Sequence, residues 1–142
     1  MLGRSAKKKP NMVPPARVLL VEDDAILAMA LEDALTNAGT NGVTVCQTMK
    51  ATMEALNDGP RPDAIVLDVH LADRDDGWAI AELVTLLGPK PPRIVFSTGS
   101  PEDIPQDIAQ MGVVFEKPYD PEELVKALCM RGKTSPFALL KR

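Results

Sequence analysis

The chain has 142 residues, 25% of them charged, and a net charge of −4 at pH 7, which fits one folded domain and excludes disorder along the whole chain. The negative charge and a content of one Trp, one Tyr and three Phe residues do not fit a nucleic-acid binder, which uses basic and stacking surfaces. No run of about 18 apolar residues is present and the cysteines stand far apart, so we expect a cytoplasmic protein without membrane insertion or a thiolate metal site.

Three parts follow one another along the chain. Residues 1–15 carry basic residues and prolines without apolar periodicity, which is typical of a flexible leader. Residues 16–131 alternate aliphatic and amphipathic runs, so we expect the folded domain there. Residues 132–142 are too few and too mixed for another domain, and we expect a C-terminal tail.

Within the domain, short aliphatic runs alternate with helical patterns. In chain order, the expected pairs of strand and helix are 18–21 with 24–38, 43–46 with 48–57, 64–67 with 78–87, 93–97 with 101–111, and 113–115 with 121–130. Because the strands are continuous aliphatic runs, both of their faces should be buried, as in a parallel sheet. The sequence therefore predicts an α/β domain with a doubly wound five-stranded parallel sheet and five flanking helices. Gly39 is well placed to end the first helix.

Polar residues follow four of the expected strands. Ligands of open α/β sheets bind beyond the carboxyl ends of the strands, so we expect these residues to converge on one edge of the sheet. They are Glu22, Asp23 and Asp24 after the first strand, Asp68 after the third, Thr98 after the fourth and Lys117 after the fifth.

Carboxylates gathered at one edge require a cation. Two carboxylates about 4 Å apart repel by roughly 4 kcal/mol at an effective dielectric constant of about 20. Mg²⁺ together with Lys117 meets the requirement, because Mg²⁺ prefers oxygen ligands and keeps positions for water or phosphate. A metal ion beside a carboxylate, a hydroxyl and an ammonium group indicates phosphoryl transfer. Asp68 would be the nucleophile, Lys117 would bind the phosphate or the carboxylate, and Thr98 would donate a hydrogen bond to the phosphoryl group.

Four sequence segments carry a family resemblance. The segments VLLVEDD, IVLDVHL, FSTG and FEKP occupy residues 18–24, 65–71, 96–99 and 115–118. In this order they resemble the receiver domain of bacterial two-component response regulators, the CheY-like domain. The resemblance implies a flavodoxin-like sheet of order 2-1-3-4-5 and a phosphoprotein that works in phosphorelay signal transduction.

The same resemblance implies a set of ligands for Mg²⁺. Asp23 would bind the metal directly and Glu22 would bind it through water. Asp68 would be both a metal ligand and the phosphoacceptor. The backbone carbonyl of His70 would complete the set of metal ligands that the protein supplies.

The resemblance also implies a switch. Thr98 and Phe115 match the switch residues of the family, and Lys117 matches its lysine, which is commonly followed by a cis peptide bond to the next proline. Phosphorylation would draw Thr98 inward and let Phe115 rotate, which would bias a surface of the fourth helix, fifth strand and fifth helix. We therefore expect a single-domain response regulator that accepts a phosphoryl group from a sensor histidine kinase or phosphotransfer protein. It would contact a downstream protein or act as a phosphate sink, as a monomer or weak dimer.

Two segments depart from the usual pattern of the family. Receivers usually have Pro where Ala72 stands and a loop one residue shorter before Gly77. The interval from Thr98 to Lys117 is also a few residues short. With the FSTG segment, these features look closer to the single-domain receivers of alphaproteobacteria that carry a Phe-Ala-Thr-Gly motif.

Two other functions stay open. A haloacid-dehalogenase-type phosphatase also uses a strand-end Asp nucleophile, a Lys and Mg²⁺, but it begins with a DxD pair, and here His70 occupies the second position of that pair. A binding module could keep the receiver fold without using phosphorylation. Turnover of phosphomonoesters would support the first alternative, and the absence of a phosphoryl adduct would support the second.

Three residues near the expected site have simpler interpretations. Asp24 is interpreted as the N-cap of the first helix rather than a metal ligand. Trp78 is interpreted as a half-buried anchor at the start of the third helix. The His70 side chain is expected to face solvent and, with Ser100, to influence the lifetime of the acyl phosphate.

Overall fold

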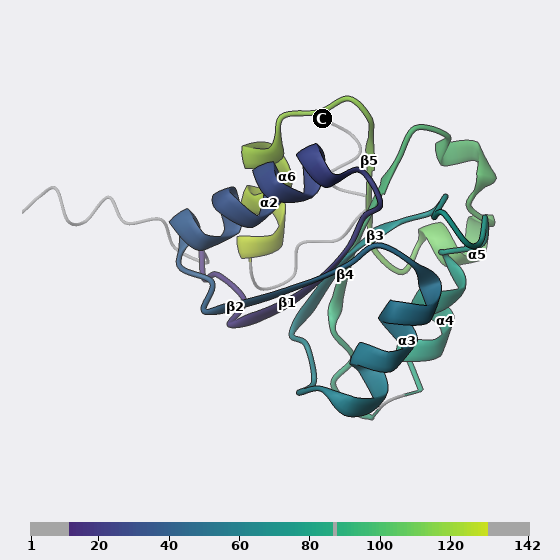
Figure 1. Cartoon of the computed structure of the whole chain (residues 1–142), viewed down its shortest axis with the longest axis horizontal. Coiled ribbons are helices and arrows are strands. Elements are labelled where there is room, and N and C mark those ends of the chain that lie inside the picture. Colours follow the sequence, from purple (N-terminus) through teal and green to yellow (C-terminus); the bar gives the residue numbers. More distant parts are fainter. Residues whose placement is uncertain (1–11, 87, 131–142) are drawn as a thin grey trace, which may run out of the picture.

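The computed structural model of the chain describes residues 12–86 and 88–130. The expected tail over residues 132–142 and residues 1–11 of the expected leader lie outside this part. Strands and helices alternate along it in the order that the sequence predicts (Figure 1). Met12 forms an antiparallel bridge with Met130, and the N–H of Val13 donates to the carbonyl of Cys129. The two ends of the described chain therefore lie side by side.

The sheet has five parallel strands in the order β2-β1-β3-β4-β5, which confirms the predicted doubly wound, flavodoxin-like fold. Its central strand, β3, is buried along its whole length, as expected for an aliphatic strand covered on both faces. The chain leaves β1 in one direction across the sheet and β3 in the other, so ligands are expected beyond the ends of these two strands. The strands are β1 Arg17–Val21, β2 Gly42–Cys46, β3 Ala64–Asp68, β4 Arg93–Thr98 and β5 Val113–Glu116.

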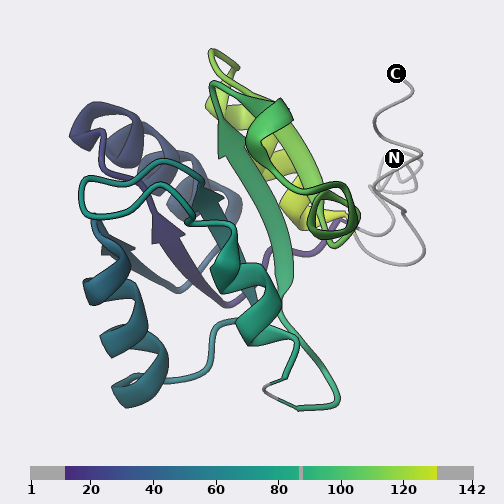
Figure 2. The ribbon, with the colours of Figure 1, turned by 90° about the vertical axis from the view of Figure 1, so that its right-hand side faces the viewer.

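Helices cover both faces of this sheet, as the two views in Figure 1 and Figure 2 show. One face is covered by α2 (Ala25–Ala38) and α6 (Pro121–Cys129). The other is covered by α3 (Met49–Asp58), α4 (Ala79–Val84) and α5 (Gln106–Ala109). Within the described residues, none of the helices has the length and apolar content needed to cross a bilayer.

Each face of the sheet has its own apolar cluster. Under α2 and α6, Leu31 and Leu124 pack into one cluster with the strand residues of that face. Under α3, α4 and α5, Ile80 and Ile108 pack into the second cluster. Trp78 is partly buried against this second cluster, which confirms its interpretation as an anchor at the start of α4. The rigid core holds the strand ends, and hence the polar residues beyond them, in fixed relative positions.

The expected fourth helix over residues 101–111 is wrong in extent. The segment forms a short 3₁₀ helix, η1 (Pro101–Asp103), followed by the four-residue α5. Pro105 has no N–H to donate and disfavours a helical backbone at the preceding residue. Accordingly, Ile104 is extended, with φ −86° and ψ 125°. The expected third helix over residues 78–87 is also too long, because α4 begins after Trp78 and ends at Val84.

The end of the first helix follows the prediction. Gly39 has a φ of 112°, and its N–H donates to the carbonyls of Leu35 and Thr36. Glycine takes this left-handed conformation without strain because it has no Cβ. The turn directs the chain from α2 into β2.

Candidate functional site

The predicted site residues lie at, or directly beyond, the carboxyl ends of neighbouring strands. Glu22 and Asp23 follow β1, Asp68 is the last residue of β3, Thr98 is the last residue of β4, and Lys117 follows β5. Because all strands are parallel, their carboxyl ends meet at one edge of the sheet. Residues that are far apart in the sequence are thereby brought to one place.

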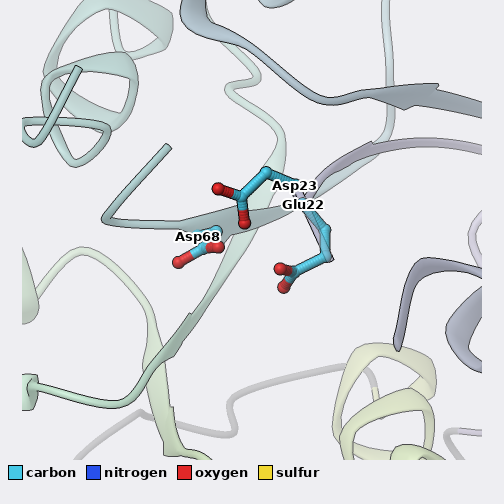
Figure 3. A group of neighbouring side chains, drawn as sticks. All are labelled: Glu22, Asp23 and Asp68. Carbon is cyan, nitrogen blue, oxygen red and sulfur yellow. The ribbon is translucent and has the colours of Figure 1, made fainter. Parts of the chain in front are cut away.

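Three carboxylates form the centre of this edge. Glu22, Asp23 and Asp68 each offer a carboxylate oxygen, and these atoms lie within 4.8 Å of one another. Figure 3 shows that Glu22 and Asp23 branch from the end of β1 and that the carboxylate of Asp23 points toward Asp68. Glu22 is fully buried and Asp68 is nearly so, whereas Asp23 is exposed. The group thus has a buried interior and one side open to solvent.

Lys117 bridges two of these carboxylates. Its Nζ lies 3.0 Å from Oε1 of Glu22 and 3.3 Å from Oδ2 of Asp68. The backbone N–H of Lys117 donates to the carbonyl of Thr98 at 2.8 Å, which continues the pairing of β4 and β5 beyond the end of β5. The peptide bond between Lys117 and Pro118 is cis, as predicted.

The proximity of these groups changes their pKa values. Burial raises the pKa of Glu22 to about 7, and the neighbouring Asp68 adds to the rise. The Asp23 side chain is exposed overall, but partial loss of solvent around its carboxylate in the cluster raises its pKa, again with a contribution from the charge of Asp68. Burial opposes the charged form of Lys117, but the charges of Asp68 and Glu22 outweigh it and place its pKa above the usual value. Three acids therefore share one ammonium group, and a second cation would relieve their repulsion.

The donor set fits a hard divalent cation. It consists of carboxylate oxygens, without an imidazole nitrogen or a thiolate in the group, and such ligands favour Mg²⁺ over softer metals. Two carboxylates and a backbone carbonyl would leave coordination positions for water or for phosphate oxygens. Among the described residues, Glu22, Asp23 and Asp68 are the Asp, Glu, His or Cys residues whose side chains lie close enough together to hold a metal ion.

We expect the Mg²⁺ affinity to fall as the pH drops below about 7. Mg²⁺ binds the carboxylate form, so below its pKa the proton on Glu22 must first be displaced. The apparent Kd should then rise about tenfold for each pH unit. Titration of Trp78 fluorescence with MgCl₂ at a series of pH values measures this dependence. Glu22→Gln should flatten it, and an unchanged wild-type Kd on both sides of pH 7 would contradict the assignment.

The same pKa shift predicts the opposite trend for stability without metal. The pKa of Glu22 in the folded protein lies above the ordinary value of 4.5, so the folded state binds this proton more tightly than the unfolded state does. The contribution of Glu22 to stability is therefore fully present below the ordinary pKa and is lost as the pH rises through about 7. Mg²⁺ should reverse the loss by binding to the deprotonated folded state.

Thr98 is fully buried at the end of β4. Its neighbour Ser97 is directly beside Asp68 in the register of the sheet. The hydroxyl oxygen of Thr98 accepts a hydrogen bond from the N–H of Ser100 at 2.9 Å. An oxygen that accepts this bond can still donate its own proton to another acceptor, so the Thr98 hydroxyl has a proton available for its predicted contact with a phosphoryl group.

Phe115 lies on β5, the edge strand of the sheet, where it is paired with Ser97 of β4. It is partly buried in the cluster under α2 and α6. Its ring is 5.6 Å from that of Tyr119, in an edge-to-face arrangement. The structure thus places the predicted switch aromatic against a second aromatic ring rather than in the metal site.

Two other predicted residues differ in how well they match their interpretations. Asp24 accepts hydrogen bonds from the N–H groups of Ile26 and Leu27, which confirms that it is the N-cap of α2. His70 is half exposed, but its ring also contacts Asp103 of η1, with Nε2 2.8 Å from the carboxylate. This hydrogen bond raises the pKa of His70. The expectation of a side chain that simply faces solvent misses the contact.

Sequence reasoning missed two contributors to the site. The hydroxyl of Tyr119 lies 2.6 Å from that of Ser97, which makes Tyr119 part of the surroundings of Asp68. The indication in the sequence was that Tyr119 follows Lys117 by only two residues. A Cβ on Gly77 would clash with the carbonyl oxygen of Asp68 and would lie 2.9 Å from that of Val69. The loop after Asp68 therefore folds back so closely that only glycine fits there.

Comparisons with known proteins find relatives of this domain. The family model of the response regulator receiver domain matches residues 18–129. The phyllosphere-induced regulator PhyR of Methylorubrum extorquens is 27% identical over 106 residues, which are 73% of this chain and 39% of PhyR. A protein-glutamate methylesterase/protein-glutamine glutaminase of Archaeoglobus fulgidus is 36% identical over 77 residues, which are 53% of this chain and 21% of that protein. The chain thus spans less than half the length of these curated relatives.

Solved structures show the same fold. The crystal structure of a response regulator receiver protein from Sinorhizobium medicae is 28% identical, with a TM-score of 0.66. The match covers 80% of this chain and 90% of that one. The described domain therefore corresponds to nearly all of that crystallised chain.

Proposed function

The chain belongs to the response regulator receiver domain family, and on this premise we propose that it is a phosphorylation switch whose phosphoacceptor is Asp68. One observation carries the proposal. The carboxylate of Asp68 lies in one group with those of Glu22 and Asp23, and Nζ of Lys117 is 3.3 Å from it. The site thus combines a nucleophile, ligands for a cation and an ammonium group at a strand end that is open on one side.

In the proposed reaction, a carboxylate oxygen of Asp68 attacks the phosphorus of a phosphohistidine. An O–P bond forms, the N–P bond breaks, and the leaving imidazole takes up a proton. The attacking carboxylate and the phosphoryl group both carry negative charge, so Lys117 must offset their repulsion. Mg²⁺ held by Glu22, Asp23, Asp68 and the backbone carbonyl of His70 would neutralise charge on the phosphoryl oxygens.

Thr98 and Phe115 would transmit the effect of phosphorylation from Asp68 to the surface of the protein. The phosphoryl group adds negative charge and new acceptor oxygens at Asp68. The Thr98 hydroxyl would donate to one of these oxygens, and Phe115 would turn on its axis beside Tyr119. The affected surface comprises η1, α5, β5 and α6, and a downstream protein would read it.

The partners follow from this chemistry. A sensor histidine kinase or a phosphotransfer protein would supply the phosphoryl group. The phosphorylated chain would bind a downstream protein, or it would serve as a phosphate sink that drains the kinase. Both roles require only protein contacts and need no nucleic-acid surface.

Phosphoramidate tests the proposed function because its N–P bond resembles that of phosphohistidine. We expect the wild-type chain to form a phosphorylated band on a phosphate-affinity gel with Mg²⁺, and to form none with a chelator. Asp68→Asn should form none in either condition. A wild-type chain that stays unphosphorylated with Mg²⁺ would favour a binding module without phosphorylation.

The phosphatase alternative makes a different demand. It needs a general acid two residues after the nucleophile, where this chain has His70, whose ring is engaged with Asp103. We therefore expect negligible turnover of phosphomonoesters such as p-nitrophenyl phosphate. Sustained turnover that Asp68→Asn abolishes would reopen this alternative.

A further inference from the structure

The loop between β3 and α4 is hydrogen-bonded to the start of α3, a helix that supplies no residue to the proposed reaction. The carboxylate of Asp73 accepts two hydrogen bonds at the start of α3. Oδ1 lies 2.8 Å from the backbone nitrogen of Met49, and Oδ2 lies 3.2 Å from that of Lys50. Asp73 follows the first of these residues by 24 positions, so this cap comes from tertiary structure rather than from the local sequence.

Asp73 completes the cap of α3. The first N–H groups of a helix have no partner inside the helix. The local N-cap, Thr48, provides for one of them, with its hydroxyl 3.0 Å from the nitrogen of Ala51. Asp73 provides for the two before it, and its negative charge is favourable at this end of the helix dipole. The hydrogen bond from Met49 accordingly lowers the pKa of Asp73.

The other end of the same loop leads into the site. The N–H of His70 donates to Oδ1 of Asp68 at 3.2 Å. The N–H of Leu71 donates to the carbonyl of Arg74 at 2.8 Å, which closes a turn around Asp73. The backbone of His70 therefore lies between two fixed points, which are the nucleophile on one side and the turn held by α3 on the other.

We propose that Asp73 is a positioning residue for the cation site. By capping α3 with both carboxylate oxygens, it fixes the turn after His70 and so holds the His70 backbone carbonyl where a cation at Asp68 can use it. This inference rests on the proposed function, which assigns that carbonyl to Mg²⁺. Because linkage is reciprocal, a cation at the site must in turn stabilise the cap on α3.

Substitutions of two aspartates in the same loop make a matched comparison of Mg²⁺ affinity. Asp73→Ala removes both bonds to α3. Asp75→Ala removes the same charge from a side chain that is 89% exposed and lies 3.4 Å from Nδ1 of the His70 ring, but it leaves both bonds between Asp73 and α3 in place. We expect Asp73→Ala to weaken Mg²⁺ binding about tenfold, as replacement of groups that orient metal ligands commonly does. Asp75→Ala should stay within about twofold of the wild type, since its exposed charge is largely screened and it contacts the ring of His70 rather than the backbone carbonyl assigned to the cation. Titration of Trp78 fluorescence with MgCl₂ measures all three Kd values.

Thr48→Ala separates positioning from simple loss of helix stability. It removes the local cap of α3 and should lower the free energy of unfolding by about 1 kcal/mol, but it leaves the loop untouched. We expect its Kd for Mg²⁺ to match that of the wild type. Asp73→Asn keeps one acceptor oxygen and should give a Kd between those of the wild type and Asp73→Ala.

Amide hydrogen exchange tests the reciprocal effect without any phosphorylation assay. Mg²⁺ should slow exchange at Met49 and Lys50 in the wild type and in Asp75→Ala, and should leave it unchanged in Asp73→Ala. The inference is overturned if Asp73→Ala binds Mg²⁺ as tightly as the wild type, or if Thr48→Ala weakens binding as much as Asp73→Ala does. A wild-type chain that binds no Mg²⁺ would instead overturn the proposed function itself.

Discussion

Replacing Lys117 with methionine should lower the rate of Asp68 phosphorylation by at least about 100-fold, the effect typical of removing a group that stabilises charge in a transition state. Lys117 supplies the positive charge that the protein itself places beside Asp68. Its Nζ lies 3.3 Å from Oδ2 of Asp68. Without it, the incoming phosphoryl group meets the acidic cluster with Mg²⁺ alone to offset the repulsion. The same change removes a positive charge next to the metal ligands, so Mg²⁺ should bind more tightly even as phosphorylation fails.

This combination of opposite effects distinguishes a role in chemistry from a role in folding. A variant that merely unfolds would lose Mg²⁺ binding together with phosphorylation. Lys126→Met is the matched control, because Lys126 is an exposed lysine of α6 and its loss should change neither quantity. Rates come from phosphoramidate reactions at saturating Mg²⁺, and affinities come from Trp78 fluorescence. Phosphorylation of Lys117→Met at nearly the wild-type rate would exclude the proposed role of the ammonium group.

Replacing Asp23 with asparagine should weaken Mg²⁺ binding by at least about 100-fold, because loss of a direct ligand should cost no less than loss of a group that only orients ligands, for which about 10- to 100-fold is usual. Asp23 is the exposed member of the three-carboxylate group, and its carboxylate points toward Asp68 (Figure 3). The amide keeps the shape of the side chain but lacks the charge that a hard cation requires. Phosphorylation of Asp68 should fall in parallel at low Mg²⁺ and recover in part at high Mg²⁺.

Asp24→Asn is a demanding control for this prediction, because the same substitution is made one residue away. Asp24 caps α2 through Oδ1, which lies 3.0 Å from the nitrogen of Ile26, and asparagine caps helices about as well as aspartate. We expect Asp24→Asn to keep the wild-type affinity for Mg²⁺ within a small factor. Equal losses in the two variants would mean that general negative charge, rather than ligation by Asp23, determines binding.

The sheet and the position of the site could be predicted from the sequence for a simple physical reason. Strands buried on both faces need continuous aliphatic runs, so β1, β3 and β4 are visible as such in the sequence. Once the strands are parallel, the residues after them must meet at one edge. Glu22, Asp68 and Lys117 could therefore be brought together without knowledge of any loop.

The segment after β4 could not be predicted in the same way. Its apolar pattern favours one helix over residues 101–111, but Pro105 interrupts the hydrogen-bonding pattern and splits the segment into η1 and α5. Proline also fits the first turn of a helix. A proline can thus start α5 or break a longer helix, and packing around Ile104 and Ile108 decides between the two.

Contacts between loops were the hardest to predict. The bonds from Asp73 to α3 and from His70 to Asp103 join residues that are 24 and 33 positions apart. An aspartate in a polar loop has no periodicity that would indicate its partner, and both contacts depend on how the loop after Asp68 is folded. The close approach of Gly77 to the backbone of Asp68 belongs to the same class.

We propose Asp68 as the phosphoacceptor of the chain. The most direct test of this proposal is to locate the phosphoryl group by tandem mass spectrometry after brief incubation with acetyl phosphate and Mg²⁺, followed by digestion under conditions that preserve acyl phosphates. We expect one modified residue, Asp68, with modification that disappears when Mg²⁺ is chelated and in Asp68→Asn. A phosphoryl group on another residue, or one that persists in Asp68→Asn, would contradict it.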